Sequence, residues 1–516
     1  MNKNKFSTIF IVLGIFSLLI SCVVVSCNKL FWMDELITYY LVTDNSLLHM
    51  LHSIADQVDS SPPFYYIVLH LWALVFGSSE LPLRLFSSLM MAGSFIVLFK
   101  SLRKVFGIYE AVIGIIVIFF INNSIFDLNS EARCYGLFLF EFSVLLYLYL
   151  EIILNNKKYY ILLSLMQMML ILTHPFGILY SLALMFSSLM YFFVTKINYR
   201  LIISSIAGFL LSAIYLPVFL NQIKVGDSHF WINRPTIGNV LGGIIDDLII
   251  CPKWLTLIIS VIGLLYFSNI IVKKVSTAIK NNSTARDHDA KLFFCILSFT
   301  LMLIPIIIFV YSLFLTPVFV KRYMIISDIA WGLIAITIMD NYKDIIIKKF
   351  ALIKREKILQ LILLGLVLAP IVASFNYRDP SREEMLKDLR ETQAGNSLVL
   401  LSPHKYLPRY YYSNNRSSIL FVLDEKIAES PDNVLNAYPD YRLMKALKRN
   451  YPSQGIVSTS YLIDSLKVFR VRNEKDRLWF GIRVVGNPNC EYSEVYKNVY
   501  EVRHKDSIVT RLNRKF

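Results

Sequence analysis

Residues 6–35 read FSTIFIVLGIFSLLISCVVVSCNKLFWMDE. The part from Phe6 to Asn28 is apolar almost throughout, and it is long enough to cross a bilayer as one helix. Polar sequence resumes at Lys29 and soon reaches two adjacent carboxylates, Asp34 and Glu35. The stretch therefore predicts a first membrane span followed by an acidic loop. Ser21-Cys22 resembles a lipoprotein cleavage site, but the apolar run continues past it, so we expect an uncleaved span.

The composition of the whole chain also indicates a membrane protein. Of its 516 residues, 56% are hydrophobic and only 17% are charged, against about a quarter in soluble domains. A net charge of +15 would suit a nucleic-acid-binding protein. In this chain, however, most basic residues of the apolar part lie in short gaps between apolar runs, as membrane topology requires. We therefore expect a lipid bilayer and no nucleic acid as a partner.

Further apolar runs of similar length follow the first, and a short one at 62–76 is expected to lie on the membrane surface because Pro62-Pro63 interrupts it. The predicted fold is mainly α, a polytopic helical bundle. We expect eleven spans in all, near residues 6–28, 84–101, 108–126, 135–154, 159–172, 176–195, 201–220, 254–272, 292–311, 323–340 and 358–375.

The basic residues between the spans predict the orientation. Gaps on one side of the membrane hold 20 Lys and Arg, and gaps on the other side hold 8. The positive-inside rule places the richer side, with the N-terminus, in the cytoplasm. We expect a multi-pass protein of the cytoplasmic membrane whose C-terminal part lies outside the cytoplasm.

The end of the chain differs from the rest in composition. From Phe375 onward it holds 24 of the 52 basic residues and 17 of the 37 acidic residues. We expect a membrane domain at 1–375, with catalytic outer loops at 29–83 and 127–134, and a small extracytoplasmic α/β domain at 376–516. In that domain β-rich runs are Ser397–Leu401, Ile419–Val422, Lys467–Val471 and Leu478–Val485, and helical patterns are Arg382–Arg390 and Tyr441–Arg449.

Charged residues in the predicted outer loops are few, which makes each one a candidate for function. Asp34 and Glu35 can supply a general base or hold a divalent cation, or they can be an ordinary solvated start of a loop. Glu131 and Arg133 lie in the loop that precedes Tyr135. Glu141 lies inside the fourth span, where an ionisable residue is either functional or a polar tie between helices.

Later loops add basic candidates. His174 lies between Thr173 and Pro175 at a predicted outer helix end, where a structural role is the alternative to binding. Lys321 and Arg322 are two cations on the side that should carry few, so they need an anionic partner. A phosphate suits them, with lipid headgroups as the alternative, and Arg84 is a weaker case of the same kind.

Several motifs resemble one family when they are taken in order. They are Trp32-Met33-Asp34-Glu35, Ser61-Pro62-Pro63-Phe64-Tyr65-Tyr66, His70-Leu71-Trp72, Glu80-Leu81-Pro82-Leu83-Arg84, Glu131-Ala132-Arg133-Cys134-Tyr135-Gly136, Thr173-His174-Pro175-Phe176-Gly177 and Arg322-Tyr323. The set resembles the family of protein O-mannosyltransferases and bacterial aminoarabinose (lipid A) transferases, which is glycosyltransferase family 39-like and of the GT-C type. The resemblance covers about residues 1–375.

The resemblance implies an integral membrane enzyme that transfers a sugar from a polyprenyl-phosphate donor to an acceptor outside the cytoplasm. Asp34 would be the general base that takes the acceptor's proton, or it would orient the acceptor. Glu35 would assist it or bind a metal. Arg322, with Lys321 and Arg84, would bind the donor phosphate. Glu131, Arg133, Tyr135 and His174 would shape the sugar and acceptor pocket.

The resemblance does not select the acceptor, so protein, glycolipid and polysaccharide remain open. No obligate cofactor is expected, although a divalent cation at Asp34 and Glu35 is possible. The alternatives are a polysaccharide polymerase or ligase and a transporter of lipid-linked glycans. A polymerase would concentrate its Arg and His in one late loop, and a transporter would show Gly- or Pro-broken helices in two similar halves. Neither pattern is evident in the sequence.

Overall fold

The computed structural model describes residues 2–195, 199–220, 232, 234–236, 261–263, 265–269, 272–273, 290–349, 356–393, 397–429, 437–451, 455–466, 468–473 and 478–505. The chain divides into two compact units. The first unit comprises Met1–Asn28, Ser61–Asn221 and Ile232–Tyr377. The second comprises Lys29–Ser60, Gln222–Trp231 and Arg378–Phe516.

The first unit is built from apolar helices. Seven helical stretches of its described part are long and apolar enough to cross a membrane. Four shorter apolar helices accompany them, at Phe64–Phe76, Ile108–Phe120, Tyr160–Thr173 and Gly177–Phe192. The long stretches are Lys3–Asn28, Glu80–Arg103, Tyr135–Asn155, Tyr199–Leu220, Ala290–Phe314, Lys321–Asn341 and Glu356–Phe375.

These helices correspond to ten of the eleven predicted spans, and the eleventh, 254–272, lies largely outside the described residues. The stretch predicted to lie on the membrane surface forms a helix that starts directly after Pro63. The helices are α1 (Lys3–Asn28), α4 (Phe64–Phe76), α5 (Glu80–Arg103), α6 (Ile108–Ile115), α7 (Asn123–Asn129), α8 (Tyr135–Asn155), α9 (Tyr160–Thr173), α10 (Gly177–Thr195), α11 (Tyr199–Ser212), α15 (Ala290–Phe314), α16 (Ile329–Lys349), α17 (Glu356–Leu366) and α18 (Ala369–Phe375).

One predicted span is interrupted. The run 108–126 forms α6 and a π-helical turn, η1 (Ile116–Phe120), and a new helix, α7, then begins at Asn123. Asn122 caps α7, because its side chain accepts a hydrogen bond from the backbone N–H of Ile125 at 3.2 Å. An Asn at this position satisfies one of the free N–H groups of a helix start, and hydropathy alone does not detect such a break.

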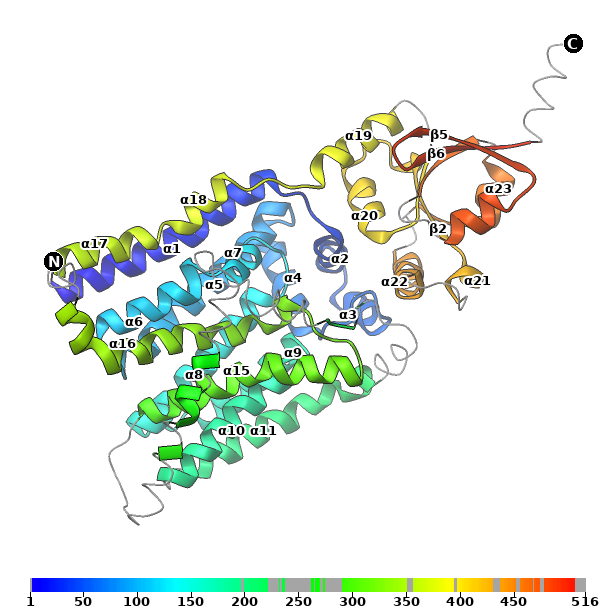
Figure 1. Ribbon diagram of the computed structural model, residues 1–516. Helices are drawn as coiled ribbons and strands as arrows, with labels where there is room; N and C mark the ends of the chain where they lie inside the picture. Colours follow the sequence, from blue (N-terminus) through cyan, green and yellow to red (C-terminus); the bar gives the residue numbers. More distant parts are fainter. Residues whose placement is uncertain are drawn as a thin grey trace, which may run out of the picture. The chain divides into compact units, whose positions relative to one another are not determined.

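Helices α5 and α8 pack against each other through small and polar residues, a common device between membrane helices. Ser94 of α5 lies 2.5 Å from Ser143 of α8, both measured at Oγ. At one end of this pair, Lys104 forms a salt bridge with Glu151. Helix α1 runs beside α18, as Figure 1 shows, and its Ser7 accepts a hydrogen bond from Arg103 at the same end as Lys104.

The second unit contains a six-stranded sheet in the order β3-β2-β1-β4-β6-β5. The first four of these strands are parallel, and β6 pairs antiparallel with β4 and β5. The strands are β1 (Leu398–Leu400), β2 (Ile419–Leu423), β3 (Ile456–Ser458), β4 (Val468–Arg472), β5 (Cys490–Tyr496) and β6 (Val499–His504).

Helices alternate with the strands along the chain from β1 to β5, and Figure 1 draws this segment in yellow to red. The helices predicted at 382–390 and 441–449 are present as parts of α19 and α22. The helices of the C-terminal segment are α19 (Arg382–Gln393), α20 (Pro403–Tyr412), α21 (Glu425–Ala428), α22 (Ala437–Asn450), α23 (Thr459–Ser465) and α24 (Leu478–Phe480), with the π-helical turn η5 (Gly481–Val485).

The prediction of a strand at Leu478–Val485 is wrong, because this run is helical. Short apolar runs do not distinguish a strand from a buried helical turn. Here Trp479, Phe480 and Val484 turn one helical face toward the hydrophobic core formed on the sheet by residues such as Val471. The run therefore covers the sheet instead of joining it.

Two helices near the N-terminus, within Lys29–Ser60, belong to the second unit, namely α2 (Met33–Val42) and α3 (Leu47–Ala55). Helix α2 packs on α20, and α3 packs on α22. The acidic pair Asp34–Glu35 therefore lies in the same compact unit as the C-terminal sheet.

Candidate functional site

The loop before α8 is tied to two neighbouring helices of the first unit. The guanidinium of Arg133 donates a hydrogen bond to the hydroxyl of Tyr66 on α4 at 3.2 Å. The carbonyl of Arg133 accepts one from Oγ of Ser87 on α5 at 3.1 Å. Arg133, Tyr66 and Ser87 are all buried. Two of the sequence motifs, the one ending at Tyr66 and the one containing Arg133, therefore meet in space.

His174 lies in a cluster of aromatic rings in the first unit. It follows the last residue of α9, where the backbone becomes extended. Its ring centroid lies 4.9 Å from that of Tyr323 and 5.9 Å from that of Tyr135. Its Nδ1 accepts a hydrogen bond from the backbone N–H of Phe176 at 3.2 Å. A neutral imidazole whose Nδ1 accepts carries its proton on Nε2.

Tyr135, His174 and Tyr323 come from three separate motifs, which the structure brings together. Phe138 and Phe176 complete the cluster, with ring centroids 5.1 Å and 5.6 Å from that of His174. Such tilted ring pairs add stabilisation beyond their buried area. We define these five residues as the His174 ring cluster.

The two predicted phosphate-binding cations, Lys321 and Arg322, directly precede Tyr323 of this cluster in the sequence. Lys321 and Arg322 start η3 (Lys321–Asp328), a 3-10 turn that leads into α16. Both are half-buried. The guanidinium carbon of Arg322 lies 5.7 Å from the ring centroid of Tyr323, within the range of a cation–π contact. Arg322 is thus in contact with a member of the His174 ring cluster, and Lys321 directly precedes it in the chain.

Arg84 and Glu131 occupy different environments in the same unit. Arg84 is fully buried near the start of α5, one turn before Ser87. A fully buried arginine is rare unless it is paired, and it is not a surface contact to lipid headgroups. Glu131 is half-buried in the loop between α7 and α8, two residues before Arg133.

The structure also gives Glu141 a partner. Its Oε1 accepts a hydrogen bond from the hydroxyl of Thr173 at 2.9 Å, and both residues are buried. This bond ties α8 to the end of α9, directly before His174. The polar tie that we considered for Glu141 is therefore present.

Asp34 and Glu35 lie in the first turn of α2, in the second unit. Glu35 is fully buried, and its Oε2 accepts a hydrogen bond from the backbone N–H of Trp32 at 3.4 Å. A carboxylate at this third helical position caps the helix, and the helix dipole favours its charge. Asp34 is half-buried, and its carbonyl accepts a hydrogen bond from Thr38. The neighbouring carboxylates thus have different surroundings.

The sequence leaves metal binding open for Asp34 and Glu35. Among the residues that the structure describes, no group of three or more His, Cys, Asp or Glu is arranged to hold a metal ion. The Oε2 atom of Glu35, a possible metal ligand, accepts the capping hydrogen bond from Trp32.

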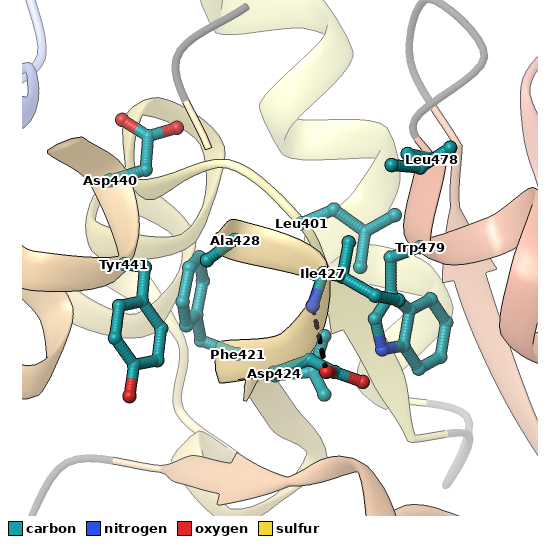
Figure 2. Close-up of a pocket in the computed structure, with 10 residues that line it drawn as sticks. Leu401, Phe421, Asp424, Ile427, Ala428, Asp440, Tyr441, Leu478 and Trp479 are labelled. Carbon is teal, nitrogen blue, oxygen red and sulfur yellow. Dashed lines mark hydrogen bonds between the residues drawn. The ribbon is translucent and has the colours of Figure 1, made fainter. Parts of the chain in front are cut away.

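A separate hollow lies in the C-terminal sheet domain, at the ends of β1 and β2, and Figure 2 shows its lining. Asp424 lines it and is already engaged, because Arg483 binds both of its oxygens at 2.9 and 3.2 Å. Thr459 donates to the same carboxylate and accepts from the indole of Trp479. These polar groups satisfy one another, and the hollow's other walls are mostly apolar, so we assign it to the packing of the domain.

Sequence reasoning did not identify two partners in the first unit. Ser87 has no chemical signal that would mark it, and Tyr66 was recognised only as part of a motif. Of the positions that do carry signals, Arg133 bonds to Tyr66, and Tyr135 and His174 meet in the His174 ring cluster.

Comparison with known proteins agrees with this architecture. Residues 60–223 match the family described as dolichyl-phosphate-mannose-protein mannosyltransferase. This region contains Arg84, Glu131, Arg133, Tyr135 and His174, and it excludes Asp34 and Arg322. No curated protein sequence matches the chain significantly.

Solved structures match over the full length. ArnT from Cupriavidus metallidurans in the apo state has 13% sequence identity and a TM-score of 0.58, and the match covers 98% of both chains. ArnT bound to undecaprenyl phosphate has 13% identity and a TM-score of 0.55, with 96% of this chain and 97% of that chain covered. The chain thus has the fold of GT-C-type membrane glycosyltransferases, and the predicted fold class is confirmed.

Proposed function

We propose, from this GT-C fold, that the protein is a membrane glycosyltransferase that takes a sugar from a polyprenyl-phosphate donor. The acceptor would be a protein, glycolipid or polysaccharide outside the cytoplasm. The match to a mannosyltransferase family over 60–223 and the undecaprenyl phosphate bound by ArnT support a lipid-phosphate donor.

One observation carries the proposal most strongly. The His174 ring cluster joins motifs that are up to 188 residues apart in the chain, between Tyr135 and Tyr323, and Arg322 contacts its Tyr323 ring. Lys321 directly precedes Arg322 in the chain. Rings and hydrogen-bonding groups next to two cations suit a sugar that carries a phosphate.

On the donor side, the reaction requires stabilisation of the negative charge on the leaving group. When the bond between the anomeric carbon and the phosphate oxygen breaks, charge accumulates on the departing polyprenyl phosphate. Arg322 and Lys321 would bind that phosphate and stabilise the charge, because preorganised cations act most strongly where charge develops. Arg84 would support the site from its buried position.

The acceptor side needs a base. The acceptor oxygen forms the new bond to the anomeric carbon and loses its proton, which Asp34 would accept. Polyprenyl phosphate leaves with the electron pair of the broken bond. The proton is then on Asp34, and the negative charge is on the phosphate that Arg322 and Lys321 would bind. Glu35 would hold the first turn of α2 in place through its capping bond.

Asp34→Asn in the purified full chain tests the base. The amide has nearly the same shape but cannot take the proton, so transfer from a lipid-linked sugar should fall at least about a hundredfold. The thermal midpoint should stay unchanged. Full transfer by this variant would remove Asp34 from the mechanism.

Arg322→Ala tests the phosphate site. Binding of undecaprenyl phosphate should weaken about tenfold or more, because a charge-assisted hydrogen bond is lost. Arg200→Ala, an exposed position at the start of α11, is the matched control and should bind normally. Equal affinities in the two variants would contradict the role of Arg322.

The substrates can be identified by mass spectrometry of cell-envelope glycans from a deletion strain. A missing sugar on one acceptor would reveal both sugar and acceptor. A transporter would instead change the distribution of a lipid-linked glycan across the membrane, and the purified protein would then show no transfer.

A further inference from the structure

The backbone just before α2 is held by the C-terminal segment of the same unit, Arg378–Phe516. The N–H of Phe31 donates a hydrogen bond to the hydroxyl of Tyr412 at 2.8 Å. The N–H of Leu30 donates one to Oδ2 of Asp379 at 3.1 Å. These two donors directly precede Trp32, which occupies the N-cap position of the helix that carries Asp34. Residues roughly 350 to 380 positions later therefore fix where α2 begins.

Aromatic rings extend this contact along α2. The ring of Tyr411 lies 6.0 Å from that of Phe31 and 5.0 Å from that of Tyr39, centroid to centroid. The ring of Tyr451 lies 6.1 Å from that of Tyr40. Both ends of α2 thus pack on rings from the C-terminal segment.

Helix α3 and the turn before it are held in the same way. The hydroxyl of Tyr451 donates to Asp44 at 3.0 Å, and His49 also bonds to Asp44. Burial raises the pKa of Asp44, but the bonds from Ser46, His49 and Tyr451 outweigh it and leave the pKa below its ordinary value. The side chain of Arg449 pairs with Asp56 at 2.7 Å.

The helix that supplies Tyr411 and Tyr412 is itself anchored. Arg409 of α20 is buried and pairs with Asp388 of α19 at 2.5 Å and with Glu384 at 2.9 Å. Arg472 of β4 pairs with the same Asp388. Removing one partner from a buried group of charges is strongly destabilising, so α20 has a fixed place on the sheet. The anchor runs from the sheet through α19 and α20 to the start of α2.

We propose that Tyr412 and Asp379 are positioning residues for Asp34. This inference rests on the proposed function, in which Asp34 is the base. A helix of ten residues is marginal alone, so α2 depends on contacts outside itself. Displacing a reacting group by about 1 Å can cost about a hundredfold in rate. The C-terminal segment thus serves catalysis by fixing the first turn of α2.

Tyr412→Phe tests the inference without relying on activity. It keeps the ring but removes the oxygen that accepts from Phe31. In hydrogen–deuterium exchange of the full chain, amides at 29–35 should exchange about tenfold faster, the factor for one net hydrogen bond. Tyr461→Phe, an exposed tyrosine of α23, is the matched control and should exchange like the wild type. Unchanged exchange at 29–35 would overturn the inference.

Asp379 supplies a second, graded test. Asp379→Asn keeps an oxygen that can accept from Leu30, whereas Asp379→Ala does not. The alanine variant should speed exchange at 29–35, and the asparagine variant should restore most of the protection. Equal exchange in the two variants would count against a positioning role for Asp379.

Transfer assays separate this inference from the proposed function. Tyr412→Phe should lower the turnover number about tenfold and leave the affinity for undecaprenyl phosphate unchanged. In an Asp34→Asn background it should cause no further loss, because it acts through Asp34. Faster exchange with full transfer would overturn the positioning role. Full transfer by Asp34→Asn alone would overturn the proposed base instead.

Discussion

At the residue scale, Asp34 and Glu35 are neighbours with different surroundings. The sequence marked both as one acidic pair. It did not indicate that Glu35 caps α2, because the usual capping signature has Ser, Thr, Asp or Asn at the cap, and this helix has Trp32 there. The sequence identified two adjacent carboxylates. It did not show that the fold uses Glu35 to cap α2 and leaves Asp34 half-buried.

This division gives a prediction for Glu35. Glu35→Gln keeps an oxygen that accepts from Trp32, and Gln also suits this capping position, so the variant should retain most transfer activity. Glu35→Ala should lower the free energy of unfolding by about 1 kcal/mol. Transfer by the two variants, compared with Asp34→Asn, provides the measurement. If Glu35→Gln is as inactive as Asp34→Asn, Glu35 takes part in the chemistry.

At the element scale, hydropathy predicted most membrane helices because an apolar run of that length has one stable form in a bilayer. It did not predict short elements whose form depends on tertiary contacts. Helix α20 contains Pro408, and Leu478–Val485 is helical because it packs on the sheet. The hairpin of β5 and β6 was also missed, although Asn498 at its turn has a positive φ of 63°.

The contact between α5 and α8 gives a prediction at this scale. A Cβ on Gly136 would lie 2.5 Å from the carbonyl oxygen of Ser87, so Gly136→Ala must push the two helices apart. Overpacking of this kind costs about 1–3 kcal/mol, and the thermal midpoint in detergent should fall. Gly365→Ala is the matched control, because a Cβ there has nothing within 4 Å. A midpoint that falls equally in both variants would contradict this explanation.

At the scale of the whole molecule, charge density distinguished the polar end of the chain from the apolar body. It carried no signal that Lys29–Ser60 packs with Arg378–Phe516, since contacts between distant segments leave no local pattern. For the His174 ring cluster, the sequence identified the motifs that contribute residues but not the contacts between their rings. Which rings touch depends on helix packing that single motifs do not specify.

The charge cluster around the half-buried Glu384 of the second unit predicts a pH dependence. Burial raises the pKa of Glu384, but Lys405, Arg409 and Arg472 outweigh it and hold the pKa below the ordinary 4.5. A lowered folded pKa contributes stability that is complete above pH 4.5 and is lost as the pH falls through the folded value. The unit should therefore unfold at lower temperature as the pH drops below 4.5.

Thermal unfolding of the full chain at several pH values checks this. Unfolding of the second unit is monitored by the susceptibility of the C-terminal segment to proteolysis. Glu384→Gln should lower the midpoint near neutral pH and reduce its fall in acid. Glu383→Gln, exposed on the same helix, should behave like the wild type. An identical acid response in all three proteins would exclude Glu384 as a cause.

The grouping of the first loop with the last segment has a consequence for biosynthesis. The ribosome makes Lys29–Ser60 more than 300 residues before Arg378, so at about 5–20 residues per second the segment waits roughly 15–65 s for its partner. During that time the amides of Leu30 and Phe31 lack the oxygens that later bind them. The start of α2 therefore reaches its final contacts late, only after the segment that contains Asp379 and Tyr412 has been synthesised.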